Sequence, residues 1–221
     1  RNIQPLFADL SSGGFTLAHN GNLTNAAALR RILVEKGCLF QSTTDTEVII
    51  HLIAISSRGT ILDKLIDAMS QIVGAYSLVA MSKDSLIGAR DPLGVRPLVL
   101  GELDGSYCIA SETCALDIIG ARFIRDILPG EIVIVDKEGV KSISPYKTKQ
   151  SRLCVFEYIY FARPDSVVDG HSVYAARKKI GRELARESNV EADVVIPVPD
   201  SGVPSAMGFA AETGLPYELG I

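Results

Sequence analysis

The chain has 221 residues, 47% hydrophobic and 22% charged, a composition typical of a globular protein with one large core or two moderate ones. Its formal net charge of -4 argues against a surface that wraps a polyanion, so we expect no nucleic-acid partner. No uncharged apolar run approaches the roughly 20 residues of a membrane span, and the first residues lack a signal-peptide pattern, so we expect no membrane and a cytoplasmic location.

The first part of the chain is expected to form one strand and three helices. The stretch FTLAHNGNLTN (15–25) alternates like a strand and then passes into His19-Asn20-Gly21-Asn22. In the second helix, Thr44 and Glu47 have the spacing of a capping box, so Asp45 falls in the first turn, where the helix dipole favours negative charge. The predicted helices span residues 24–36, 42–55 and 61–73.

After Gly74 the hydrophobic period changes to two, which predicts antiparallel strands in AYSLVAM, SLIGAR, PLVLGEL, SYCIAS and EIVIVD. Helices followed by such a meander indicate an α+β domain. The stretch PYKTKQS (145–151) is polar and basic, the composition of an inter-domain connection. The predicted domains are therefore 1–150 and 151–221.

The sequence of the second predicted domain indicates the start of a parallel α/β domain. Residues 172–188 form an amphipathic helix, and DVVIPV (193–198) is a continuous apolar run of the kind found in buried parallel strands. A short helix over 204–213 and an apolar strand over 216–221 follow. The apolar stripe of the first helix consists of Val173, Ala176, Ile180 and Leu184.

Asn20-Gly21 is the first candidate site. Glycine permits a backbone conformation closed to other residues, and the Asn amide supplies two donors, so the pair suits an oxyanion hole for acyl transfer. Asn-Gly is also the strongest signal for a type I′ hairpin turn, and the pattern alone favours that turn. A helix rather than a strand follows, which weakens the hairpin interpretation.

Two further candidates have equally plain structural alternatives. Asp45 suits the α-amino group of a small substrate, but a carboxylate at a helix N-terminus is usually a cap. The loop GARDPLGVRPLVLG (88–101) carries Arg90, Asp91 and Arg96, which suit either a bidentate carboxylate clamp or a loop pinned to itself. The second, structural role is the one we expect for this loop.

The stretch DVVIPVPDSGVPSA (193–206) sends an apolar run into Asp200-Ser201-Gly202 and then into a helix N-terminus. Backbone N–H groups at such a place form a cradle for phosphate or pyrophosphate. A simple Pro-Asp-Ser-Gly turn explains the pattern equally well.

Taken together and in order, AHNGNLTN, TDTEV, GARDPLGVRPL, ASETCALD, LCVFEYIYFARPDS, SVYAARKKIG and VPDSG closely resemble the glutamine phosphoribosylpyrophosphate amidotransferase (amidophosphoribosyltransferase) family. The resemblance covers essentially the whole chain. It implies a partial N-terminal-nucleophile hydrolase αββα sandwich, followed by the start of an α/β type I phosphoribosyltransferase domain. In this family, an N-terminal cysteine hydrolyses glutamine, and the ammonia passes through a channel to phosphoribosylpyrophosphate, giving 5-phosphoribosylamine in the first step of purine synthesis.

The resemblance also assigns roles to residues. Asn20 and Gly21 match the oxyanion-hole pair, and Asp45 matches the aspartate that holds the glutamine α-amino group. Asp200, Ser201 and Gly202 match the pyrophosphate loop. The family implies Mg²⁺ with phosphoribosylpyrophosphate, purine nucleotides as feedback inhibitors, and a homo-oligomer.

Two further interpretations, both at the domain junction, follow from the same resemblance. Cys154 matches a position that is an iron-sulfur ligand in some members, although such clusters normally need four cysteines. Tyr158, Tyr160 and Arg163 lie where the family closes its ammonia channel, and interface packing explains them equally well.

Alternatives remain at the level of function. One is another class II glutamine amidotransferase, such as a glutamine-fructose-6-phosphate or asparagine-synthesising enzyme, which VPDSG argues against because those enzymes carry different synthase domains. Another is a non-catalytic regulatory relative that keeps the fold.

The family's nucleophilic cysteine and its downstream DDS signature are both absent from the 221 residues, and none of the four cysteines matches the nucleophile. We therefore expect this polypeptide, a fragment of the family's full length, to hydrolyse no glutamine and to transfer no amine. A glutaminase assay on the 221-residue polypeptide checks this, and turnover would contradict it.

Overall fold

The computed structural model describes residues 2–146, 150–188 and 190–220. It divides into two compact units: unit 1, Arg1–Ser111 with Ile124–Leu153, and unit 2, Glu112–Phe123 with Cys154–Ile221. The sequence did not indicate that Glu112–Phe123 belongs with the later residues. Residues 147–149, next to the predicted boundary at 150, lie outside the described residues, and the assignment of domains 1–150 and 151–221 stays a prediction.

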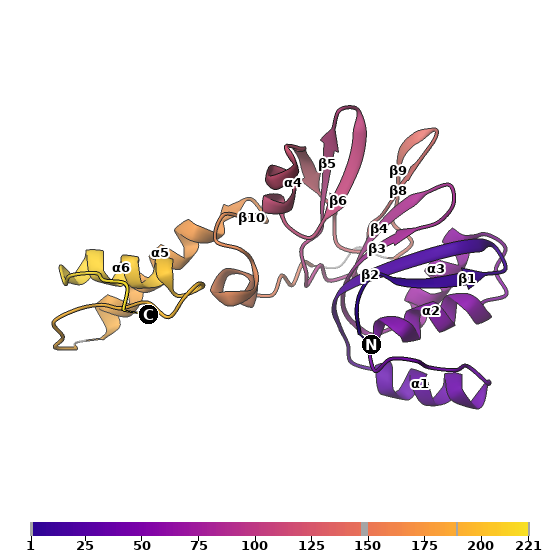
Figure 1. The fold of residues 1–221 in the computed structure, drawn as a ribbon, viewed down its shortest axis with the longest axis horizontal. Coiled ribbons are helices and arrows are strands. Elements are labelled where there is room, and N and C mark those ends of the chain that lie inside the picture. Colours follow the sequence, from indigo (N-terminus) through magenta and orange to yellow (C-terminus); the bar gives the residue numbers. More distant parts are fainter. Residues whose placement is uncertain (1, 147–149, 189, 221) are drawn as a thin grey trace. The chain divides into compact units, whose positions relative to one another are not determined.

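A six-stranded antiparallel sheet forms the centre of unit 1 (Figure 1). Its strand order is β1-β2-β3-β4-β8-β9, so β2 and β3 pair although three helices separate them in the chain. The strands are β1 (Leu6–Leu10), β2 (Gly13–Leu23), β3 (Gly74–Met81), β4 (Leu86–Arg90), β8 (Ile132–Asp136) and β9 (Gly139–Ile143).

A three-stranded sheet of order β6-β5-β7 and three helices complete this part of the chain. The strands are β5 (Val99–Leu103), β6 (Ser106–Ala110) and β7 (Arg122–Asp126), and the helices are α1 (Ala26–Glu35), α2 (Thr46–Ile55) and α3 (Ile61–Gln71). Helix α4 (Thr113–Ile119) connects β6 to β7 in the sequence.

The two faces of the six-stranded sheet bury different cores. In β8, Ile132 and Ile134 pack with the buried residues of α2 and α3, while Val133 between them packs with Leu100 of β5. Alternate residues of a strand point to opposite faces, so helices cover one face and the second sheet covers the other. The alternate residues of EIVIVD therefore contribute to two different cores. Unit 1 accordingly has three layers in the order α-β-β.

The capping box predicted at Thr44 and Glu47 is wrong. Helix α2 begins only at Thr46, and Glu47 instead accepts hydrogen bonds from the N–H groups of Gln41 and Ser42, at 2.8 and 2.9 Å. The carboxylate satisfies the loop that enters the helix because those N–H groups have no strand or helix partner of their own. A capping box does occur in α3, between Thr60 and Asp63.

The described residues of unit 2 form helix α4, introduced above, together with one irregular helical turn, a short hairpin and two further helices. These are the π-helical turn η1 (Glu157–Phe161), β10 (Val167–Val168), β11 (His171–Ser172), α5 (Val173–Glu187) and α6 (Val203–Thr213). Helices α5 and α6 pack backbone to backbone: a Cβ on Gly181 would lie 1.9 Å from the Ser205 oxygen, and one on Gly208 would lie 2.1 Å from the Lys178 oxygen. Only glycine permits this approach.

That crossing rotates α5 away from the predicted orientation. Its buried residues are Val173, Arg177 and Gly181, whereas Ile180 and Leu184 of the predicted apolar stripe are 44% and 51% exposed. Gly181, rather than Ile180 and Leu184, faces α6, because a residue without a side chain allows the two helices to pack more closely.

The predicted buried strand over 193–198 is also wrong for the described residues. Val195 makes an isolated parallel bridge to Tyr217, and Val194, Ile196 and Val198 are exposed. A buried parallel strand needs paired neighbours and cover on both faces, and the described residues supply one bridge. The predicted strand over 216–221 is likewise reduced to the bridge at Tyr217.

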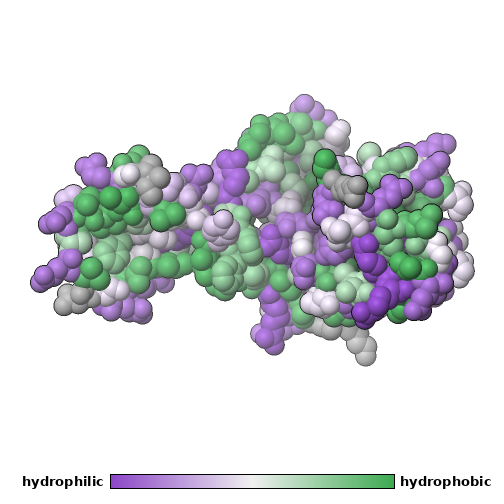
Figure 2. All heavy atoms as spheres, turned by 60° about the horizontal axis from the view of Figure 1, so that its bottom comes forward, coloured by the Kyte–Doolittle hydropathy of each residue, from purple (hydrophilic) through white to green (hydrophobic). Residues whose placement is uncertain are grey.

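Apolar side chains remain on the surface of unit 2, visible as green patches at the left of Figure 2. Among the described residues, no helix is both long and apolar enough to cross a membrane. All four cysteines are free thiols.

We expect Glu131→Gln to lower the free energy of unfolding by about 2 kcal/mol at neutral pH, because a buried charge partner is lost. Glu131 is 4% exposed and receives Arg125 bidentately at 2.7 and 2.9 Å and the Leu128 N–H at 2.7 Å. Burial alone raises the pKa of the Glu131 carboxyl, but these bonds outweigh it and the pKa lies below its usual value.

The stabilisation is therefore present above the unfolded pKa of about 4.5 and disappears as the pH falls through the lower folded pKa. Urea unfolding at neutral and acidic pH measures this, and the gap between wild type and Glu131→Gln should narrow in acid. The matched control is Glu138→Gln, whose side chain is 64% exposed and should matter little. A gap that is the same at both pH values contradicts the assignment.

Candidate functional site

The Asn20-Gly21 pair lies inside β2 rather than at its end. Asn20 pairs with Ser77 of β3 and Gly21 pairs with Tyr76, and the strand continues to Leu23. The hairpin-turn interpretation is therefore wrong. The long-range pairing with β3 overrides the local turn signal of Asn-Gly.

One edge of β2 presents alternate backbone N–H groups away from β3. The backbone N–H and C=O of Tyr76 are engaged by Asp91, so Gly21 faces Tyr76 as a pair without ladder hydrogen bonds, and its own N–H points to the opposite edge. On that edge the His19 N–H donates to Gln4 Oε1, and the Leu23 N–H donates to Asp45 Oδ2 at 2.9 Å. The Gly21 N–H lies between these two fixed points.

Only glycine fits at residue 21. A Cβ there would lie 2.0 Å from the Ala75 carbonyl oxygen and 2.7 Å from His19 Nε2, and φ is +155°. The side-chain-free residue lets β2 and β3 stay paired beside the buried His19 ring.

Asp45 is not a helix cap, although it is the residue before α2. It makes no side-chain capping bond; its Oδ2 accepts from the Leu23 N–H, and its Oδ1 lies 3.5 Å from His19 Nδ1. Its side chain is 21% exposed. An ionised carboxylate has about four acceptor sites, so Asp45 keeps capacity for an ammonium group that enters from solvent.

His19 joins Asp45 to β3 and is 8% exposed. Its Nε2 is 3.3 Å from the Ala75 oxygen and its Nδ1 is 3.4 Å from Thr46 Oγ1. Neither this bridging position nor the clamp made by Gln4 was indicated by the sequence; the only signal is the position of His19 directly before Asn20.

The Asn20 side chain is held at both ends. Its Oδ1 accepts from Arg96 Nη2 at 2.9 Å, and its Nδ2 is 3.3 Å from Ser111 Oγ. In the predicted loop 88–101, the buried Arg90 and Asp91 bind the loop's own backbone, which confirms the expected structural role. The contact of Arg96 with Asn20 is not part of that prediction.

In unit 2, a pocket of about 560 Å³ brings the pyrophosphate-loop and junction candidates together. Its lining includes Tyr160 and Arg163, which come from the segment before α5, and Asp200 and Ser201, which come from the loop before α6. Gly202 is the N-cap residue of α6. The three residues Asp200-Ser201-Gly202 thus form the loop at a helix N-terminus that the sequence predicts.

Arg177 also lines this pocket, and the sequence did not single it out. It is 1% exposed, donates from Nε to the Tyr158 oxygen and from Nη2 to the Ala162 oxygen, each at 2.7 Å, and its Nη1 has no hydrogen-bond partner among the described residues. Burial lowers the pKa of the Arg177 guanidinium from its usual value, but arginine stays charged at neutral pH. The pocket therefore contains a buried positive charge.

Arg163 and Tyr158 are placed differently from each other. The Arg163 guanidinium pairs with Asp165 on the surface, at 2.8 and 3.0 Å. Tyr158 donates its hydroxyl to the Val168 oxygen at 2.6 Å and lines a neighbouring pocket of about 530 Å³, not the one with Asp200.

Cys154 is a half-buried free thiol. Across the described ranges, no three His, Cys, Asp or Glu side chains come together as they would to hold a metal ion.

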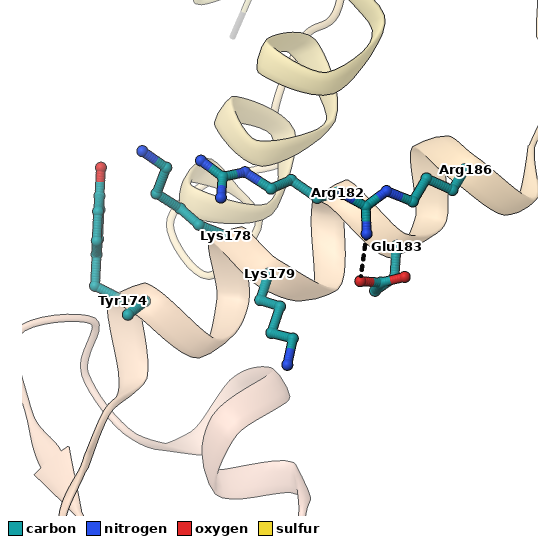
Figure 3. Close-up of a pocket in the computed structure, with 7 residues that line it drawn as sticks. Tyr174, Lys178, Lys179, Arg182, Glu183 and Arg186 are labelled. Atoms are coloured by element: carbon teal, nitrogen blue, oxygen red, sulfur yellow. Dashed lines mark hydrogen bonds and ion pairs between the residues drawn. The ribbon is translucent and has the colours of Figure 1, made fainter.

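A basic pocket of about 480 Å³ lies along α5. The side chains of Lys178 and Arg182 point to one side of the helix and Lys179 points away from them, while Arg186 pairs with Glu183 at 2.8 Å (Figure 3). These charges are solvated surface groups and none of them was a predicted site residue.

Residues 1–117, more than half of the chain, match the family described as glutamine amidotransferase domain. The amidophosphoribosyltransferase of Rhizobium etli is 56% identical across the whole of this chain, which covers 46% of that relative. The Bacillus subtilis amidophosphoribosyltransferase is 47% identical, with 46% of it covered, and a chloroplastic one from Arabidopsis thaliana is 48% identical, with 39% covered. The chain thus spans less than half the length of these curated relatives.

Among solved structures, the glutamine phosphoribosylpyrophosphate amidotransferase from Bacillus subtilis, complexed with ADP and GMP, matches 99% of this chain with a TM-score of 0.93 and 47% identity. The chain covers 48% of it. A structure described as the allosteric regulatory enzyme of purine biosynthesis matches with a TM-score of 0.92. The predicted fold class, a mixed helix-and-sheet N-terminal-nucleophile fold, is confirmed.

We expect Gly21→Ala to lower the free energy of unfolding by about 1–3 kcal/mol, because the added methyl group overlaps the Ala75 oxygen and β2 must move away from β3. Urea unfolding of the chain measures the change. Gly59→Ala is the matched control, since its Cβ would meet nothing within 4 Å. A Gly21→Ala chain as stable as the control would contradict the close approach of β2 to β3.

Proposed function

The chain belongs to the glutamine amidotransferase domain family, and from this we propose that its complete gene product is a glutamine-dependent amidophosphoribosyltransferase. The enzyme would make 5-phosphoribosylamine from phosphoribosylpyrophosphate and glutamine, the first step of de novo purine synthesis. The observation that carries this proposal is the extent of the similarity: relatives with this name match both units, not only residues 1–117.

In the glutamine half-reaction, Asn20 Nδ2 and the Gly21 N–H are the proposed donors to the oxyanion. Both are fixed before substrate arrives, the first by Arg96 and Ser111 and the second by the anchored edge of β2. Preorganised donors cost no reorganisation when charge develops, which is why they favour the transition state over the substrate. The attacking thiol would come from an N-terminal cysteine outside the 221 residues.

Asp45 is the proposed partner of the glutamine α-amino group. Its carboxylate is held by the Leu23 N–H, two residues beyond the Gly21 N–H on the same edge of β2. The ammonium anchor and the oxyanion donor would thus be set by one strand, which fixes the substrate along it.

In the transfer half-reaction, the loop Asp200-Ser201-Gly202 is the proposed pyrophosphate site. Its position before α6 supplies backbone N–H groups and the positive end of the helix dipole, and Arg177 adds a buried charge to the same pocket. Tyr158, Tyr160 and Arg163 remain proposed junction residues. Residues 151–221 are accordingly the proposed start of a phosphoribosyltransferase domain.

The described residues do not fit an iron-sulfur cluster, because Cys154 has no partner ligands and a cluster normally needs four cysteines. Mg²⁺ is proposed to enter with phosphoribosylpyrophosphate, since this ion usually binds through substrate phosphates and water rather than in an all-protein cage.

Regulation by purine nucleotides is proposed from the similar Bacillus subtilis enzyme, whose structure is a complex with ADP and GMP. A homo-oligomeric state and a cytoplasmic location are proposed as well. A non-catalytic regulatory relative remains the alternative. Such a relative would release no pyrophosphate from phosphoribosylpyrophosphate, whereas the proposed enzyme would.

In the complete gene product, we expect Asn20→Ala to lower kcat with glutamine by about 10²–10³-fold, the effect of one lost oxyanion donor. Synthesis of 5-phosphoribosylamine from phosphoribosylpyrophosphate and added ammonia should be unchanged, because ammonia bypasses the glutamine site. Asp45→Asn should instead raise KM for glutamine by about 10-fold or more, since it removes a charge-assisted bond to the ammonium group.

Both activities are followed as pyrophosphate release with each nitrogen source. Loss of ammonia-dependent synthesis in both variants would indicate damage to the fold rather than to a glutamine site. A wild-type protein that releases no pyrophosphate with either nitrogen source would support the non-catalytic relative.

A further inference from the structure

Arg96 and Asn20 are 76 positions apart in the chain, yet Arg96 Nη2 donates to Asn20 Oδ1 at 2.9 Å. A guanidinium can only donate hydrogen bonds, so the atom that faces it must be the amide oxygen. The two ends of an Asn amide look alike in shape, and this contact selects one orientation of the two.

That orientation directs the Asn20 Nδ2 group away from Arg96. One of its hydrogens is used by Ser111 Oγ at 3.3 Å, and an NH₂ group has two. The second hydrogen is the one available to an oxyanion. With the amide reversed, its oxygen, which has only a partial negative charge and no proton to donate, would face the proposed oxyanion and repel it.

The backbone of Arg96 is rigid because buried charges hold its loop. Arg90, 5% exposed, donates to the Arg96 oxygen at 2.7 Å and to the Gly94 oxygen at 3.0 Å. Asp91, fully buried, accepts the N–H groups of Leu93 and Val95, each at 2.9 Å. The loop therefore has little freedom to withdraw the Arg96 side chain.

A second tie fixes Arg96 relative to Asn20 itself. The Arg96 oxygen also accepts from Ser77 Oγ at 3.2 Å, and Ser77 is the residue of β3 directly opposite Asn20 in β2. Backbone and side chain of Arg96 thus contact both members of one cross-strand pair.

We propose that Arg96 is a positioning residue of the oxyanion hole: it fixes the Asn20 amide with Nδ2 toward the reacting carbonyl and strengthens that donor. Because Asn20 Oδ1 accepts a hydrogen bond from the Arg96 guanidinium, the amide is polarised and its N–H groups become better donors. The inference rests on the proposed function, in which Asn20 stabilises the oxyanion.

The test uses the complete gene product and four variants: Arg96→Met, Arg96→Lys, Asn20→Ala and the double variant Arg96→Met/Asn20→Ala. The matched control is Arg31→Met, which changes an exposed arginine of α1. For each protein, kcat and KM are measured with glutamine, and synthesis from added ammonia reports on the fold and the transfer half-reaction.

We expect Arg96→Met to lower kcat with glutamine by about 10–100-fold, less than the loss of the donor itself, with a much smaller change in KM. Arg96→Lys should recover part of kcat, because one cationic donor remains. In the Asn20→Ala background, Arg96→Met should cost less than about 3-fold, since no amide is left to orient. Ammonia-dependent synthesis should match wild type throughout, as it should for Arg31→Met.

Three results overturn the proposal. A rise in KM with kcat preserved means that Arg96 binds the substrate carboxylate. Losses that multiply in the double variant mean that Arg96 acts independently of Asn20. Equal loss of glutamine- and ammonia-dependent synthesis in both Arg96→Met and Arg96→Lys means that Arg96 supports the fold. If Asn20→Ala alone keeps full activity, the oxyanion role in the proposed function fails first, which separates the two ideas.

Discussion

The geometry of the proposed glutamine site depends on one edge of β2, where alternate N–H groups point away from β3. The pairing that runs through Asn20 and Gly21 sends every second amide to the same side, and two of the three along this edge are fixed by side chains of Gln4 and Asp45. If the pairing of β2 with β3 ended before Asn20, these N–H groups would belong to a turn, and their directions would be less fixed. The regular strand thus sets the direction of a donor more tightly than a loop does.

Buried charges occur where irregular backbone must be held. Arg90 and Arg177 are 5% and 1% exposed, and each directs its donors at carbonyl groups of a loop or of the π-helical turn. Burying an unpaired charge would be costly, but a guanidinium that meets several carbonyls satisfies orphaned acceptors with one side chain. Asp91 is the anionic counterpart, since it collects N–H groups of the same loop as Arg90.

The sequence predicted those helices and strands whose formation depends on the hydrophobic pattern of neighbouring residues. The helices over 24–36 and 61–73 and the strands of the meander follow from hydrophobic period, because packing on one face requires it. The Asn-Gly turn and the Thr44 capping box failed because distant groups outcompete local ones: β3 for the first, loop amides for Glu47 in the second.

The α5 stripe and the strand over 193–198 failed for a related reason. Periodicity does not state which neighbour covers a face: for α5, two glycines decide it, and for residues 193–198 the described residues offer one bridge, from Val195 to Tyr217. In the candidate site, residue chemistry indicated Asn20, Gly21 and Asp45, and family resemblance gave them their roles. Arg96 was expected to have a structural role in its own loop, and its contact with Asn20 was not predicted. Gln4 and Arg177 were not singled out, because their partners are far away in the chain. The close contact of α5 with α6 at Gly181 and Gly208 also has a consequence for motion: neither helix can slide along the other without steric overlap, so we expect the two to move together. The Arg177 side chain donates to the Tyr158 and Ala162 oxygens, and its own carbonyl oxygen accepts from Ser205 of α6, so one residue links the π-helical turn to both helices.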